Sequence, residues 1–172
     1  MVYAVTHVLS TIICVDLYRN YITKHKKYFP LFTVLIAGIG GLLPDIDVPL
    51  GWILSLLNWN IGILAHRALT HTPLFGLLFL IPGLFFWWRK QHKIGMIFFV
   101  ISFGIFLHIF LDVMTSDGTS GSMLFWPFSA VEYGLTVVTK KNASTIYASL
   151  DAIFLLGWLT REELKHKIKD FF

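Results

Sequence analysis

The chain has 172 residues, of which 56% are hydrophobic and only 14% are charged, and its mean hydropathy is +0.70. Soluble domains carry about 25% charged residues, so this composition excludes an ordinary soluble protein and indicates an integral membrane protein. The net charge of +4 comes from short basic clusters beside apolar runs, a pattern that orients membrane proteins. No nucleic acid is therefore expected as a partner. The length fits a single domain over 1–172.

The apolar stretches predict an all-α polytopic membrane bundle with four to six spans. The expected spans cover about 2–18, 29–43, 73–89, 94–113 and 145–160. Pro44 disfavours helical backbone at Leu43, so the second helix should end there, and an interfacial or re-entrant helix should follow at about 50–64. Thr72 can cap the next span, and Pro73 suits the first helical position.

Basic clusters at 19–27 and 89–93 place both of these loops in the cytoplasm by the positive-inside rule. Seven histidines and aspartates then fall toward the non-cytoplasmic ends of their spans, namely His7, Asp45, Asp47, His66, His71, His108 and Asp112. Because the spans follow from apolar length alone, this convergence on one face supports a single site. The sequence thus predicts a multi-pass protein of the cell membrane with its site near the non-cytoplasmic face. The topology after residue 125 stays open.

Two aspartate motifs have the spacing of metal ligands. His108 and Asp112 are four residues apart on a predicted helix, so their side chains share one face. An unpaired aspartate inside a span is costly, which favours a ligand pair over a capping aspartate beside a core histidine. Asp45 and Asp47 flank one residue, and both carboxylates point the same way if the backbone is extended. Their repulsion beside a helix C-terminus would be relieved by a cation, although a polar turn is the alternative.

His66 and His71 are predicted to lie on either side of a corner. On one continuous helix they would be about 140° apart, which is poor for sharing an ion. The helix start predicted just after His71 implies a break between them and removes this difficulty. Two interfacial histidines without a shared ion are the alternative reading. His7, at the outer end of the first span, is either a further ligand or a packed polar residue of the core.

A mixed set of histidines and aspartates suits zinc, with manganese or iron as alternatives. An ion with open coordination positions acidifies bound water and polarises a scissile bond, which is what hydrolysis requires. One to three divalent ions are therefore expected, held by ligands drawn from His7, Asp45, His66, His71, His108 and Asp112. Asp47 is expected to act as general base or ligand. Arg67 either binds a phosphate ester over the metal or pairs with a nearby aspartate.

Five motifs run through the chain, and they are Thr6-His7, the stretch from Gly41 to Asp47, that from His66 to Thr72, that from His108 to Asp112, and Trp126-Pro127-Phe128. Taken together they resemble the YdjM/YbcI-type family of inner-membrane proteins, described as metal-dependent hydrolases. The resemblance implies that the six ligand candidates are the polar positions of such a protein, with Asp47 and Arg67 beside them. The His-x-x-x-Asp unit is also distantly similar to zinc-dependent phospholipase C and the P1-type nucleases, which hydrolyse phosphodiesters.

The predicted function is therefore metal-dependent hydrolysis at the non-cytoplasmic face of the inner membrane. The expected substrate is a phosphoester such as a phospholipid head group, and membrane lipid is the expected partner. The main alternative is a non-catalytic protein that binds or transports a metal. Transport would need a polar path to the cytoplasm, for which Asp16 and Asp151 are the acidic candidates at depth. A structural membrane protein without a site is a third reading, and a haem protein would leave the aspartates unexplained.

Overall fold

A computed structural model describes residues 4–23, 28–58, 67–116 and 121–135, together with 151, 153, 155–158, 160 and 161. Its α-helices are α1 (Ala4–Leu17), α2 (Leu31–Leu42), α3 (Asp47–Leu56), α4 (Pro73–Trp88) and α5 (His92–Met114). Shorter helical segments are η1 (Tyr18–Ile22), η3 (Leu43–Ile46) and η5 (Leu69–His71). Over these ranges the only strand-like pairing is one isolated bridge between Ser122 and Tyr133, so the all-α prediction is confirmed.

Two of the described helical segments are long and apolar enough to cross a membrane. They are Phe32–Leu56, with 25 residues, and His92–Met114, with 23. α4 is also apolar but has 16 residues, and α1 has 14. These helices occupy the regions predicted from the sequence, whereas a total of four to six spans stays a prediction. The last predicted span is described only in part, and its described residues are helical.

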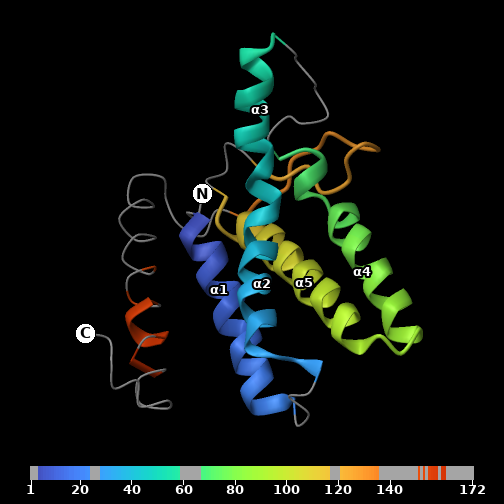
Figure 1. The fold of residues 1–172 in the computed structure, drawn as a ribbon. Coiled ribbons are helices and arrows are strands. Elements are labelled where there is room, and N and C mark those ends of the chain that lie inside the picture. The colour runs from blue at the N-terminus through green and yellow to red at the C-terminus, as the bar shows by residue number, and fades with distance from the viewer. Residues whose placement is uncertain are drawn as a thin grey trace.

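The second α-helix ends within one residue of the predicted position, but the chain stays helical beyond Pro44. α2 ends at Leu42, η3 follows as a 3-10 turn, and α3 begins directly at Asp47. Pro44 stands in the first positions of the 3-10 turn, where a missing amide N–H costs little. The extended backbone expected around Asp45 is therefore absent as well. α3 is helical over ten residues and projects past the other helices (Figure 1), and the rest of the predicted 50–64 helix lies mostly outside the described residues.

α5 is the central helix of the bundle and packs against α1, α2 and α4 (Figure 1). Small residues allow α2 and α5 to approach closely, as the glycines of the second span suggest. A Cβ at Gly40 would lie 2.7 Å from the carbonyl oxygen of Ile101, and a Cβ at Gly104 would lie 2.6 Å from the backbone nitrogen of Gly41. Backbone therefore touches backbone at this crossing, which lies one helical turn below His108 on α5.

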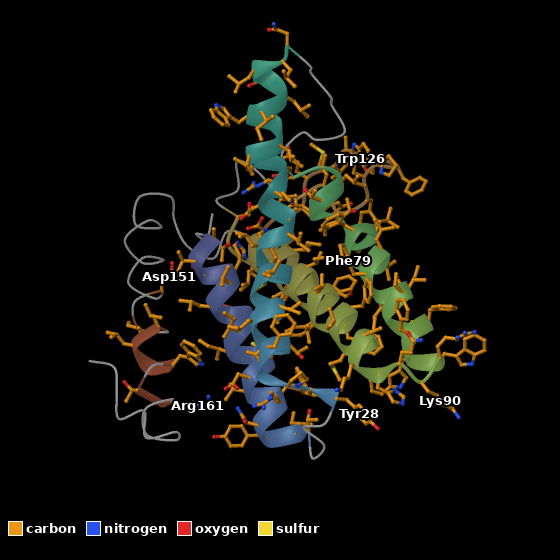
Figure 2. All side chains as sticks on the ribbon, in the orientation of Figure 1. Tyr28, Phe79, Lys90, Trp126, Asp151 and Arg161 are labelled. Carbon is orange, nitrogen blue, oxygen red and sulfur yellow. The ribbon has the colours of Figure 1, made fainter. Side chains whose placement is uncertain are left out.

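The C-terminal segment is attached to α1 by polar contacts at two levels. The Thr6 hydroxyl donates to the Asp151 carboxylate near the start of α1, and Arg161 pairs with buried Asp16 near its end. Figure 2 shows both Asp151 and Arg161 on the side of this segment that faces α1. Asn20 also donates to Asp16 at 2.6 Å. Both deep aspartates considered for a transport path thus have structural partners.

The corner predicted after residue 66 is present in the described part of the chain. Arg67 has a φ of 68°, η5 follows as a single 3-10 turn, and α4 begins at Pro73. Thr72 caps that helix, because its hydroxyl oxygen accepts a hydrogen bond from the backbone N–H of Phe75 at 3.4 Å. The 3-10 turn directs His71 back into the bundle, where its side chain is fully buried.

Candidate metal centre

Four side chains from three parts of the chain meet at one end of the bundle. Asp45 comes from η3, His71 from η5, and His108 and Asp112 from the last turns of α5. The Nε2 atoms of His71 and His108 are 3.3 Å apart. Asp112 Oδ2 lies 3.4 Å from Nε2 of His71 and 3.6 Å from Nε2 of His108. Asp45 Oδ1 lies 3.7 Å and 3.6 Å from the same two nitrogens.

These separations match the spacing of ligands around a small divalent ion. Zinc takes nitrogen and oxygen ligands at about 2.0–2.2 Å, so two ligands of a tetrahedral zinc ion are about 3.4 Å apart. The separations between these nitrogen and oxygen atoms range from 3.3 to 3.7 Å, which is long for direct hydrogen bonds and suitable for ligands that share an ion. Buried His and Asp groups here could therefore hold a metal ion.

The second ring nitrogen of each central histidine is engaged by other groups, which leaves Nε2 facing the centre. His108 Nδ1 is 2.7 Å from the carbonyl oxygen of Gly41, to which it can donate. His71 Nδ1 is 3.1 Å from the hydroxyl of Thr70 and 3.5 Å from Asp47 Oδ2. Metal-binding histidines are commonly oriented in this way by a carbonyl or a carboxylate. Each ring is thus oriented with its Nε2 toward that of the other.

Asp47 lies on the far side of His71 and is held there by two donors. Its Oδ2 accepts hydrogen bonds from the Thr70 hydroxyl at 2.9 Å and from the backbone N–H of Arg67 at 3.2 Å. Asp45 and Asp47 therefore both approach His71, but at opposite nitrogens and not side by side as the sequence suggested. The helical backbone of η3 and α3 is the reason, because neighbouring helical positions point in different directions.

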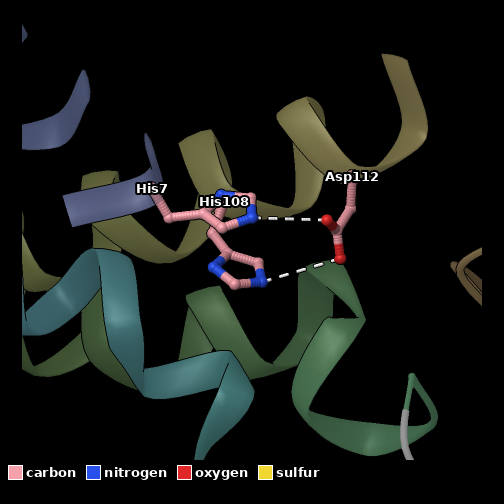
Figure 3. Close-up of side chains that lie close together, drawn as sticks. All are labelled: His7, His108 and Asp112. Atoms are coloured by element: carbon pink, nitrogen blue, oxygen red, sulfur yellow. Dashed lines mark ion pairs between the residues drawn. The ribbon is translucent and has the colours of Figure 1, made fainter. Parts of the chain in front are cut away.

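His7 adds a third imidazole to the centre. Its ring stacks on that of His108 with centroids 3.7 Å apart, and its Nε2 lies 3.4 Å from Asp112 Oδ1 (Figure 3). Nδ1 of His7 and both carboxylate oxygens of Asp112 are buried and have no hydrogen-bond partner among the described residues. An uncompensated buried carboxylate is costly, and a cation would remove that cost.

The two possible ligand groups of the centre share one histidine. His7, His108 and Asp112 form one possible ligand group, and Asp45, His71 and His108 form another. Both groups need His108, whose Nδ1 is occupied by a backbone carbonyl, so only its Nε2 is available. The two groups are therefore alternative sets of ligands around the same nitrogen of His108.

The electrostatic surroundings of His71 also favour a positive charge. Burial lowers the pKa of His71. The facing carboxylates of Asp112, Asp45 and Asp47 raise it by more than burial lowers it, and the result is a pKa of about 10. Three carboxylates around a fully buried imidazole thus create a strongly anionic pocket. In such a pocket a divalent cation can replace the proton.

Of two further residues predicted to belong to the site, Arg67 and His66, the structure describes only Arg67. Arg67 is buried beside the centre, and its Nη1 lies 3.5 Å from the carbonyl oxygen of Gly121. Its left-handed φ is unusual for a residue with a side chain and is typical of functional positions. His66 lies outside the described residues. The contacts of Thr70 with His71 and of the Gly41 carbonyl with His108 were not predicted, although both residues belong to the motifs described above.

We expect Asp47→Asn to weaken metal binding without abolishing it. The amide keeps the size of the side chain but removes the charge behind His71 Nδ1, so the imidazole becomes a poorer ligand. Zinc affinity should fall by about 10- to 100-fold, the usual cost of losing a group that orients a ligand. Zinc titration of detergent-purified protein against a competing chelator measures this change. An affinity equal to that of the unaltered protein would show that Asp47 does not support His71.

Comparison with known proteins places the chain in a family. The model of the YdjM inner membrane protein family matches residues 1–167. No curated protein and no solved structure matches the chain. The match covers nearly every residue, including all elements that form the candidate centre, and it agrees with the membrane-capable helices. The chain therefore belongs to the YdjM inner membrane protein family.

Proposed function

We propose that this protein is a membrane-bound hydrolase that uses one divalent ion, zinc, to cleave a phosphoester. The observation that carries the proposal is the set of separations of 3.3–3.7 Å among Nε2 of His71 and His108 and the carboxylates of Asp45 and Asp112. A zinc ion held by these groups would polarise a phosphoryl oxygen and acidify water. An exclusively structural role would not require a partly accessible ligand, yet the side chain of Asp45 is 22% exposed.

The surrounding residues have separate parts in this proposal. Asp112 holds the ion from the buried side, and His7 supports Asp112 through Oδ1. Asp47 is a positioning residue, because it acts on His71 through Nδ1. Arg67, whose backbone N–H donates to Asp47, is assigned the binding of the phosphoryl group, because a guanidinium matches phosphate geometry.

The proposed orientation places the centre near the non-cytoplasmic surface. η1 and the turn between α4 and α5, which carry basic residues, lie at the end of the bundle opposite the centre (Figure 1). The rings of Tyr28 and His92, 5.0 Å apart, connect these two regions. His108 lies about 24 Å along α5 from its start, at 1.5 Å per residue. With the basic end in the cytoplasm, the centre falls near the outer limit of a hydrocarbon core about 30 Å thick.

The proposed activity is tested by coupling metal content to hydrolysis. Detergent-purified protein should contain about one zinc per chain by elemental analysis. It should hydrolyse a water-soluble phosphodiester such as bis(p-nitrophenyl) phosphate, lose activity with a chelator, and regain activity when zinc is restored. His108→Ala should remove both zinc and activity. Zinc-loaded protein that is inactive toward a panel of soluble and lipid phosphoesters would contradict hydrolysis and favour the non-catalytic metal-binding alternative.

A further inference from the structure

An apolar groove with a volume of about 550 Å³ opens directly beside the candidate centre. We call it the Asp45 groove, and its walls include Ala4, Ile39, Leu42, Ile46 and Val48, with Asp45 as the one charged residue of its described lining. Ala4 lies one helical turn before His7 on α1, so the first turn of that helix closes one side. Its volume is within the range of sites that bind small molecules.

Asp45 connects the groove with the buried centre. Asp45 is one of the residues that line the groove, and its carboxylate faces Nε2 of His71 and His108. The side chains of these histidines are fully buried and that of Asp112 is 1% exposed, whereas that of Asp45 is 22% exposed. Among the four residues His71, His108, Asp112 and Asp45, Asp45 is therefore the most accessible, and it alone belongs to both the groove and the centre.

Most walls of the groove belong to a helical segment that is long and apolar enough to cross a membrane. Ile39, Leu42, Ile46 and Val48 all lie in Phe32–Leu56, a segment long and apolar enough to cross a membrane, and their side chains are exposed. A wall of this kind is costly to expose to water and favourable against hydrocarbon. The groove thus offers an apolar surface to membrane lipid and a carboxylate at the candidate centre.

We propose that the Asp45 groove receives the alkyl chain of a membrane amphiphile whose phosphoryl group is placed at the centre, an inference that rests on the proposed function. The groove walls bind the chain by apolar contact, and Arg67 and the ion bind the charged end. The substrate class is therefore a phosphoester of the membrane itself, and a small soluble phosphoester lacks the part that the groove binds.

A second apolar groove provides an internal control. It is larger, with a volume of about 840 Å³, and is lined by residues such as Cys14, Tyr18, Trp87 and Phe99. It lies near the opposite end of α1, away from the centre, and its described lining has no charged residue. Alkyl chains should enter this groove by partitioning alone, without any dependence on metal.

Photolabelling in lipid nanodiscs tests the proposal without relying on turnover. The probe is dodecylphosphonate with a diazirine near the end of its chain, a compound that cannot be hydrolysed, and dodecanol with the same diazirine is its neutral counterpart. Mass spectrometry then locates the label. We expect zinc to increase phosphonate labelling of the Asp45 groove several-fold over chelator-treated protein. Labelling of the larger groove, and all labelling by the dodecanol probe, should not respond to zinc.

Two matched variants sharpen this test. Ile39→Trp fills the groove at a position away from the ligands and should lower the zinc-dependent labelling several-fold with zinc content unchanged. Ile53→Trp places the same side chain on an exposed position of α3 outside the groove and should leave the labelling unchanged. Labelling that is independent of zinc, or equal in the two variants, would overturn the proposal even if soluble phosphodiesters are hydrolysed. Zinc-dependent labelling without hydrolysis of any phosphoester would support the groove and overturn the hydrolase.

Discussion

Asp112→Asn should abolish zinc binding by this protein. The carboxylate of Asp112 lies among the Nε2 atoms of three histidines, at 3.4 Å from His7, 3.4 Å from His71 and 3.6 Å from His108. An amide of the same size keeps the packing but removes the anionic ligand from a buried site. Loss of a group that only orients a ligand lowers metal affinity by about 10- to 100-fold. Loss of the ligand itself should therefore lower zinc affinity by more than about 100-fold. Elemental analysis and zinc titration measure this loss.

Asp16→Asn is the matched control for this experiment. Asp16 and Asp112 are both 3% exposed on apolar helices, but Asp16 pairs with Arg161 and Asn20 far from the centre. The control should lose stability from the broken ion pair and still bind zinc with full affinity. Zinc should raise the thermal midpoint of the unaltered protein and of Asp16→Asn but not that of Asp112→Asn. Equal zinc content in all three proteins would refute the site.

Gly104→Ala should destabilise the bundle and weaken the centre at the same time. A Cβ at Gly104 would lie 2.6 Å from backbone atoms of Gly40 and Gly41 and 2.8 Å from the carbonyl oxygen of Ala37. Backbone atoms cannot move aside as a flexible side chain can, so α2 must separate from α5. We expect a loss of about 1–3 kcal/mol in the free energy of unfolding, as is usual for overpacking.

The same separation should lengthen the hydrogen bond between His108 Nδ1 and the Gly41 carbonyl, now 2.7 Å. A poorly oriented His108 should reduce zinc affinity by about tenfold or more. Thermal unfolding in zinc-free detergent and a zinc titration separate the two effects. Gly51→Ala on α3 is the control, since a Cβ there meets no atom within 4 Å. It should raise stability by about 0.5–1 kcal/mol and leave zinc affinity unchanged. The interpretation fails if Gly104→Ala behaves like Gly51→Ala.

Rules that involve only residues close in sequence were sufficient to predict many features of this protein. A low fraction of charged residues and long apolar runs indicate membrane helices, because hydrocarbon tolerates few charges. Thr72 and Pro73 identify a helix start, because capping and a fixed φ act within one turn. The spacing of His108 and Asp112 places both side chains on one face of α5. For these features the responsible interactions join residues that are close in sequence.

Local rules failed where a distant contact decided the outcome. The proline rule located the end of α2 to within one residue, but it did not predict the 3-10 turn that leads directly into α3. Asp16 pairs with Arg161, 145 residues further along the chain, although Arg19 is close in sequence and donates instead to the carbonyl oxygen of Phe29. Each of these choices depends on neighbours that only the folded bundle brings within reach.

The amino-acid sequence by itself therefore determined the kind of protein, its helices and the residue types of its centre. The tertiary structure alone decided how those residues are used. It placed Asp45 and Asp112 at Nε2 of His71 and Asp47 at Nδ1, and it set a backbone carbonyl behind His108. The physical reason is that a metal centre depends on the direction of each donor atom. That direction is set by packing between helices that are far apart along the chain.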